Sequence, residues 1–191
     1  KFLEAAQYFH EASSLPQSDR SPVYAAMEGR AYSGAGQHGR AIPIIRDAIV
    51  VLERVHYQLM HQATPPKAEM QKSLKYLLDA RAYLAEAMFE QGDHQIAAAV
   101  VNQSLNVEEN HLPSLIAYSY FARCYCKSED AIRGLLKAMI VDQSNKRARR
   151  LLAKVLRAEN GLEQLWLQIA PDASTAAAYA FLATICKDHS A

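Results

Sequence analysis

Cysteine and histidine can bind transition metals or attack substrates, so their spacing is the first test for chemistry. Cys124 and Cys126 supply two thiols one residue apart, but a zinc site needs further cysteine or histidine at short spacing, and none lies nearby. His56 and His61 are five residues apart, which puts them on different faces of a helix. We therefore expect no metal ion, no cofactor and no enzymatic activity. We interpret the two cysteines as small, half-buried residues of a packed helix.

The glycines at 34, 36 and 39 are the nearest approach to a phosphate-binding loop. A loop of that kind follows a strand and opens a helix. Here no alternating strand pattern precedes the glycines, and both flanking segments have helical spacing. We therefore expect these glycines to end one helix and to separate it from the next.

Positive charge is concentrated between residues 146 and 157, in a chain whose net charge is only +1. The run contains Lys146, Arg147, Arg149, Arg150, Lys154 and Arg157, and only Glu159 offsets it nearby. Clustered arginine binds carboxylate or phosphate through paired hydrogen bonds. Such a helix can hold an acidic peptide, a phosphorylated segment or an RNA backbone. A solvated helix face that serves solubility alone is the simpler interpretation of the same run.

These residues must be positioned by helices, because small and large apolar residues recur at helical spacing along the chain. Residues 112–145 are typical of two amphipathic helices that form a hairpin. Equivalent positions in the preceding segment lie thirty-four residues earlier: Ala97 and Ala131, Val101 and Leu135, Ser104 and Ala138. A fixed period of this length predicts a stacked array of helical hairpins.

The first part of the chain follows the same pattern with a different start. Residues 1–15 are expected to be the second helix of a hairpin whose first helix lies outside this sequence, so Phe2 and Phe9 should be partly exposed. The same argument applies to Phe181 and Leu182 at the other end. Gly29 lies inside the helix that begins at Pro22, which costs about 1 kcal/mol relative to alanine and indicates close approach of a neighbouring helix.

One hairpin is expected to be longer than the others. The equivalent alanines Ala41 and Ala97 are fifty-six residues apart, which exceeds the period by twenty-two. Shared between two arms, the excess adds about three helical turns to each. Residues 63–66, Ala-Thr-Pro-Pro, should form the tip, with a helix resuming at Lys67 and continuing through Gln91.

Composition limits the class of protein. The chain has 191 residues, of which 50% are hydrophobic and 21% charged, as in a folded protein rather than a disordered one. Its three cysteines are an odd number, which favours a reducing compartment, and no apolar run reaches the length of a membrane span. We expect a cytoplasmic or nuclear protein without a membrane span, and a fragment of a larger chain.

This pattern resembles the tetratricopeptide repeat family. The matching residues are Gly29, Tyr32, Gly36, Ala41, Ile45 and Ala48, then Leu84, Ala85, Gly92, Asp93, Ala97, Val101 and Ser104, then Leu115, Ser119, Ala131, Leu135 and Ala138, and finally Leu152, Ala153 and Leu156. The resemblance implies an all-α, right-handed solenoid of hairpins. Positions that bind a carboxyl terminus in the chaperone-binding branch of the family hold Ala26, Arg30, Glu86, Pro113 and Ala117, which do not fit that role.

With this resemblance we expect one solenoid over residues 1–191. Its parts are the second helix of a preceding repeat (1–15), a repeat (22–55), the inserted hairpin extension (56–77), two repeats (78–111 and 112–145), a degenerate repeat (146–175) and the start of a further repeat or a cap (176–191).

The resemblance also implies a concave groove lined by the first helix of each hairpin. Its predicted partner-binding residues run from acidic through aromatic to basic: Asp79, Glu86, Glu90, Ile116, Tyr120, Arg123, Arg147, Arg150, Lys154 and Arg157. The leading hypothesis is a non-enzymatic scaffold, or a subunit of a larger assembly, that holds a peptide or helix with an acidic or phosphorylated segment. The alternative is an RNA-binding helical repeat, suggested by the pentatricopeptide-like residues Tyr125, Cys126 and Lys127.

Overall fold

The structure is a computed structural model, and it describes residues 1–15, 21–64 and 66–156. In these ranges the regular elements are all α-helices, so the all-α prediction is confirmed there. They are α1 (Phe2–Ser13), α2 (Ser21–Gly34), α3 (His38–Met60), α4 (Lys67–Gln91), α5 (His94–Val107), α6 (Leu112–Cys124), α7 (Ser128–Val141) and α8 (Lys146–Leu156). The predictions for Arg157, Phe181, Leu182 and the segments beyond residue 156 lie outside the described residues.

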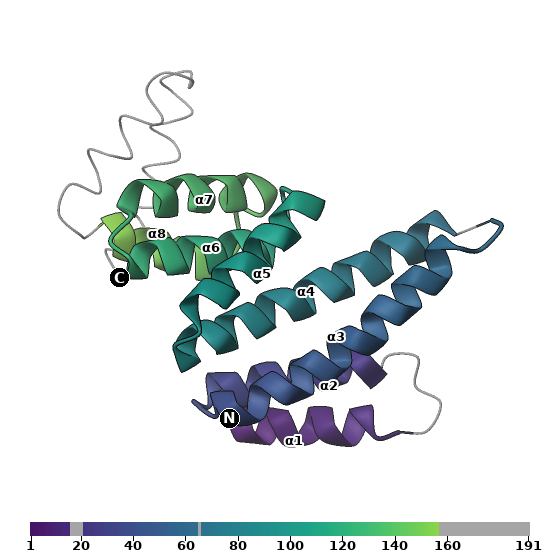
Figure 1. Cartoon of the computed structure of the whole chain (residues 1–191). Helices are drawn as coiled ribbons and strands as arrows, with labels where there is room; N and C mark the ends of the chain where they lie inside the picture. The colour runs from purple at the N-terminus through teal and green to yellow at the C-terminus, as the bar shows by residue number, and fades with distance from the viewer. Residues whose placement is uncertain (16–20, 65, 157–191) are drawn as a thin grey trace. The chain divides into compact units, whose positions relative to one another are not determined.

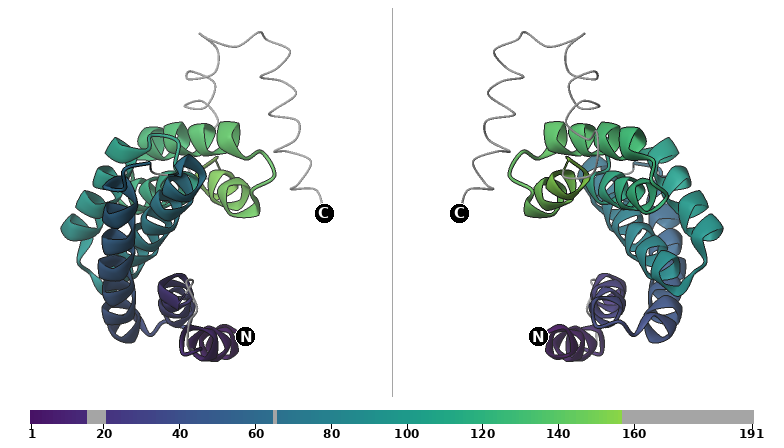
Figure 2. Two further views of the ribbon diagram at one scale, coloured as in Figure 1. Left: turned by 90° about the vertical axis from the view of Figure 1, so that its right-hand side faces the viewer. Right: turned by 90° about the vertical axis from the view of Figure 1, so that its left-hand side faces the viewer.

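The chain divides into two units, Lys1–Glu109 and Asn110–Ala191. In the first unit each helix packs on the next, from α1 to α5, and α2 also contacts α4 (Figures 1 and 2). In the second unit α6 packs on α7, α7 on α8, and α6 also contacts α8 (Figure 1). Consecutive helices that are neighbours in space are the pattern that the hairpin prediction requires.

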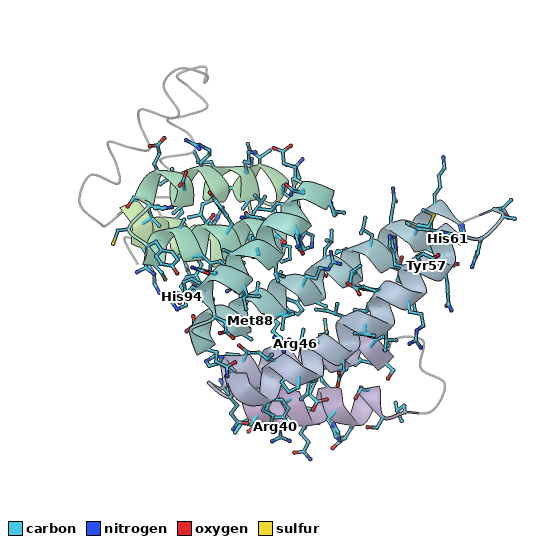
Figure 3. All side chains as sticks on the ribbon, in the orientation of Figure 1. Arg40, Arg46, Tyr57, His61, Met88 and His94 are labelled. Atoms are coloured by element: carbon cyan, nitrogen blue, oxygen red, sulfur yellow. The ribbon has the colours of Figure 1, made fainter. Side chains whose placement is uncertain are left out.

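The predicted long hairpin is present as α3 and α4. These helices have 23 and 25 residues, whereas α2 and α5 have 14 each, and α4 begins and ends where the sequence predicted. Side-chain contacts join the two arms: Arg81 Nη2 lies 2.8 Å from Glu53 Oε1 at the base of the extension, and His56 Nδ1 lies 2.7 Å from Ser73 Oγ within it. Near the tip, the rings of Tyr57 and His61 stack with their centroids 4.0 Å apart (Figure 3).

The interior glycine of α2 allows α3 to approach closely, as predicted. A Cβ atom at Gly29 would overlap the side chain of Ile45 and lie 3.1 Å from the carbonyl oxygen of Ala41. Ile45 and Ala41 belong to the buried stripe of α3, whose other members are Ile42, Ala48, Ile49 and Leu52. Their spacing of three and four residues is the helical period that put one face of α3 into the core.

Helices α2, α4 and α6 end in the same way. In each, the amide of one residue bonds three positions back and the next amide bonds five positions back, which defines a Schellman turn. The donor and acceptor pairs are Gly36 to Ser33 (2.9 Å) and Gln37 to Tyr32 (2.9 Å), Gly92 to Phe89 (3.1 Å) and Asp93 to Met88 (2.9 Å), and Cys126 to Arg123 (3.0 Å) and Lys127 to Ala122 (2.9 Å). The third turn thus has a cysteine, at φ 57°, where the first two have glycine at 78° and 106°.

The structure corrects the interpretation of the cysteines. Cys124 is the last residue of α6 and Cys126 lies beyond it in the turn, and both are exposed rather than half-buried in a packed helix. The sequence has no glycine at this point, so the turn was not predicted. Among the glycines at 34, 36 and 39, only Gly36 adopts positive φ, and Gly39 belongs to α3.

The prediction for the amino-terminal aromatic residues is confirmed. Phe2 is 60% exposed although its ring lies beside Gly34 of α2, and Phe9 is partly buried.

Candidate binding surfaces

The three predicted acidic residues lie on one face of α4. Asp79, Glu86 and Glu90 are separated by seven and four residues, so they share a side of the helix with Tyr83 between them. Asp79 and Glu86 are half-buried, and Glu90 is exposed. The acidic end of the predicted surface is therefore accessible mainly through Glu90.

Tyr83 joins this face of α4 to α2. The guanidinium carbon of Arg30 lies 4.4 Å from the centroid of the Tyr83 ring, and Arg30 Nη1 donates a hydrogen bond of 3.3 Å to the Tyr83 hydroxyl. Burial raises the pKa of Tyr83, and the carboxylates of Asp79 and Glu86 raise it further, while Arg30 lowers it. Removal from water penalises the charged phenolate, which is why burial dominates.

The space between α2 and α4 is small. A cavity of about 40 Å³ is lined by Val23, Ala26, Met27, Tyr76, Asp79, Ala80 and Tyr83. That volume holds a water molecule but not a peptide side chain. A partner on this face therefore contacts the exposed ends of the α4 side chains rather than the gap between the helices.

The predicted apolar and aromatic residues of α6 differ in access. Ile116 is only 3% exposed, so its side chain belongs to the buried residues of the helix. Tyr120 is half-buried and Arg123 is exposed. The tyrosine ring tilts against the buried Phe121, with centroids 6.2 Å apart. Of these three predicted residues, Tyr120 and Arg123 can thus meet a ligand without rearrangement of α6.

Helix α8 is divided sharply into an apolar and a basic face. Arg147, Arg150 and Lys154 are exposed and follow one another at spacings of three and four residues. The opposite face is buried and consists of Ala148, Leu151, Leu152, Ala153, Val155 and Leu156. Packing against α7 and α6 fixes this rotation of the helix, so its three predicted basic residues point away from those neighbours.

Two contacts fix the beginning of α8. Asn145 Oδ1 accepts hydrogen bonds from the amides of Arg147 (3.1 Å) and Ala148 (3.0 Å), as an N-cap side chain does. Arg149 is half-buried, and its Nε donates a hydrogen bond of 2.8 Å to the carbonyl oxygen of Gln143. Arg149 therefore holds the turn between α7 and α8, although in sequence it was part of the basic run.

Sequence reasoning missed a largely apolar cleft in the first unit, between α1, α2 and α3. It contains the buried carboxylate of Glu28, which lies beside Gly29 on the inward side of α2. The sequence did contain a signal for it: Glu28 lies between Ala25 and Tyr32, which were expected to face inward. Because carboxylates are rarely buried without a partner, an acidic residue at such a position indicates a polar contact or a site.

The described part of the chain shows no grouping of three or more histidine, cysteine or acidic side chains that could hold a metal ion. His56 and His61 make separate contacts, to Ser73 Oγ and to the carbonyl oxygen of Tyr57. None of the helices described here is long and apolar enough to cross a membrane.

No protein-family model matches the chain, and no curated protein matches it in sequence.

Proposed function

We propose that this chain is a protein-interaction module without enzymatic activity, built from tetratricopeptide-like hairpins in a right-handed solenoid. The exposed face of α8 binds an acidic or phosphorylated segment of a partner protein. Because the chain is proposed to be part of a larger assembly, that segment belongs to another subunit or to a client of the assembly.

The observation that supports this proposal is that basic side chains of α8 are exposed and make no contact with a described carboxylate. Arg150 and Lys154 are exposed, and neither contacts a carboxylate within residues 1–15, 21–64 and 66–156. They stand on a helix that is anchored at its start by Asn145 and along one face by buried leucine and valine side chains. Cations on a rigid element lose little further freedom when they bind an anion, which favours binding.

The geometry favours a protein ligand over RNA. Sequence-tolerant RNA binding uses exposed aromatic rings interleaved with cations, so that bases stack while phosphates pair. The exposed face of α8 contains arginine and lysine but no aromatic residue among 146–156. Arginine pairs with carboxylate and phosphate groups in the same bidentate way, and an acidic peptide needs no stacking platform.

The test is the double variant Arg150→Glu/Lys154→Glu, compared with the wild-type chain and with Lys67→Glu/Lys75→Glu on α4. The control variant also reverses two exposed positive charges, so it changes the net charge by the same amount, and its two residues lie in the other unit. Each tagged chain, shown by circular dichroism to be folded, captures proteins from a lysate treated with ribonuclease.

Loss of a defined protein from the α8 variant alone supports the proposal, and phosphatase treatment of the lysate then separates phosphorylated from acidic segments. The same proteins on all three chains would exclude α8 as the binding surface. If partners are captured only from a lysate without ribonuclease treatment, and the amount captured falls steeply as the salt concentration is raised, the RNA-binding alternative is favoured.

A further inference from the structure

A second candidate site lies in the first unit, in a cleft of about 880 Å³ between α1, α2 and α3. Its apolar lining is supplied by Pro22, Ala25, Ile44, Ala48, Val51 and Val55. Its polar side chains are His10, Ser13, Ser21, Glu28, Arg40 and Asp47. A largely apolar cleft of this size with a few convergent polar groups has the properties of a ligand site.

Glu28 is the unusual residue of this cleft. It is only 5% exposed, yet its carboxylate contacts a single side chain among the described residues, His10, whose Nδ1 lies 3.2 Å from each carboxylate oxygen. A carboxylate accepts about four hydrogen bonds, and a buried carboxylate with few donors is costly. Within the described residues, the Glu28 carboxylate therefore retains acceptor capacity, and it lines the cleft.

His10 does not close the cleft. Its side chain lines the cleft but is 65% exposed, so it can turn away from Glu28 into water without disturbing the core. A histidine is moreover a cation only when protonated, so Glu28 has no permanent positive partner among the residues that the structure describes. A ligand that carries a permanent cation replaces His10 at a gain in Coulomb energy.

The cleft lining carries two carboxylates, Glu28 and Asp47, and one permanent cation, Arg40. The guanidinium of Arg40, the residue labelled on α3 in Figure 3, lies 4.1 Å from the centroid of the Tyr32 ring. Arg40 is thereby held on an aromatic face. Asp47 follows it on α3 and adds a second carboxylate to the lining that Glu28 provides.

An aliphatic surface stands beside these carboxylates. Val51 and Val55 are 42% and 39% exposed and lie one helical turn apart on α3, following Asp47 at intervals of four residues. The order along the helix is thus acid, then two partly exposed apolar residues. This order matches a side chain with a cationic head and a hydrocarbon stem.

We propose that this cleft binds an arginine side chain of a partner protein, with the guanidinium at Glu28 and Asp47 and the methylene stem on Val51 and Val55. Arginine fits better than lysine because its planar fork makes two parallel hydrogen bonds to one carboxylate and is less strongly hydrated. The site is separate from the proposed anion-binding face of α8 and does not depend on it.

The probe is the capped tripeptide acetyl-Ala-Arg-Ala-amide, titrated into the ¹⁵N-labelled full chain and followed by NMR. Its control is the same peptide with citrulline, which keeps the shape and replaces the guanidinium by a neutral urea. We expect saturable shifts of amides around Glu28, Asp47 and Val51 with the arginine peptide, and at least tenfold weaker binding of the citrulline peptide. Equal shifts with both peptides would overturn the proposal.

The matched variants are Glu28→Gln and Glu69→Gln, which make the same chemical change inside the cleft and at an exposed position of α4. Glu28→Gln should weaken binding of the arginine peptide at least tenfold, and Glu69→Gln should leave it unchanged. If Glu28→Gln does not fold, the exposed Asp47→Asn should weaken binding about threefold. Unchanged binding in the cleft variant that folds would refute the assignment.

A free guanidinium compound is the other source of the same chemistry, and butylguanidinium serves as its probe. Weaker binding of butylguanidinium than of the tripeptide supports a protein ligand, because the peptide backbone then adds contacts. Equal or tighter binding of butylguanidinium would overturn the assignment to a partner protein.

Discussion

The guanidinium of Arg30 on α2 covers the ring of Tyr83 on α4 and donates a hydrogen bond to its hydroxyl, across 53 residues of sequence. The pair connects two helices that are not consecutive, so it adds to the packing that the hairpins themselves provide. It also places a permanent cation beside a phenol on which the half-buried carboxylates of Asp79 and Glu86 act with opposite sign.

Tyr83→Phe should destabilise the first unit by about 1 kcal/mol, because the buried ring stays while the hydrogen bond from the guanidinium is lost. Urea unfolding followed by circular dichroism measures this change. Tyr8→Phe is the control, since Tyr8 is exposed and the same loss of a hydroxyl there should change stability by less than about 0.5 kcal/mol. Equal effects at the two positions would mean that the Arg30 contact contributes nothing.

The raised pKa of Tyr83 predicts a loss of stability in alkali. The folded pKa lies above the model value of 10.0, so the folded chain holds this proton more tightly than the unfolded chain. The contribution of Tyr83 is therefore constant below pH 10 and falls as the pH rises from there through the folded pKa. Unfolding free energies between pH 8 and 11 should converge for wild type and Tyr83→Phe. Parallel curves would contradict the prediction.

Cys126→Gly should stabilise the second unit by about 1 kcal/mol. Cys126 adopts the left-handed conformation at φ 57°, which costs a residue with a Cβ atom roughly 1 kcal/mol and costs glycine almost nothing. Cys124→Ala removes the neighbouring exposed thiol inside the helix and serves as the control, with little change expected. Gly92→Ala makes the reverse change at the equivalent turn of α4 and should destabilise the first unit by a similar amount.

Thermal unfolding of the reduced proteins measures all three variants. A cysteine variant that gains nothing, while Gly92→Ala loses stability, would show that the turn at Cys126 is not strained.

Gly29→Ala should be strongly destabilising, by about 1–3 kcal/mol, since the added methyl group overlaps Ile45 in a packed core. Gly39→Ala is the matched control. Its added methyl group would meet only Gln91 Nε2 at 4.0 Å, and alanine favours the helix by about 0.5–1 kcal/mol. The two substitutions should therefore have opposite signs in the same chemical-denaturation experiment. A common sign would show that helix propensity rather than close packing decides at Gly29.

Helix ends and buried small residues were predictable from the sequence because single residue types determine them. Proline before Lys67 and glycine after Gln91 gave the bounds of α4, and the small residues with a period of thirty-four are buried, as Ala97, Ala131 and Ala138 show. Such positions depend on local backbone preference or on the volume available between two helices, both of which a sequence expresses directly.

The binding surfaces were less predictable, because exposure depends on how each helix is rotated against its neighbours. Ile116 was expected on an open face and is buried, while Arg149 belongs to the basic run of the sequence but bonds the backbone at Gln143. The turn at Cys126 was not predicted, because it has a cysteine where the equivalent turns of α2 and α4 have glycine. Glu28 escaped notice because its burial results from three helices that meet around it.

Asn145→Ala should release the first turn of α8. The side chain of Asn145 caps the amides of Arg147 and Ala148, and removal of an N-cap costs about 1 kcal/mol. Hydrogen exchange at those two amides should become about fivefold faster, while amides in α3 stay unchanged because they belong to the other unit. Asn145→Asp is the control, since a carboxylate caps equally well and interacts favourably with the helix dipole.

The proposed function adds a second consequence of Asn145→Ala, because basic side chains on a frayed turn bind an anion at a greater entropic cost. Asn145→Ala should therefore weaken partner capture, and it should reduce the contribution of Arg147 more than that of Lys154, which lies beyond the released turn. Full capture by a variant whose first turn exchanges rapidly would show that binding does not need α8 to be ordered in advance.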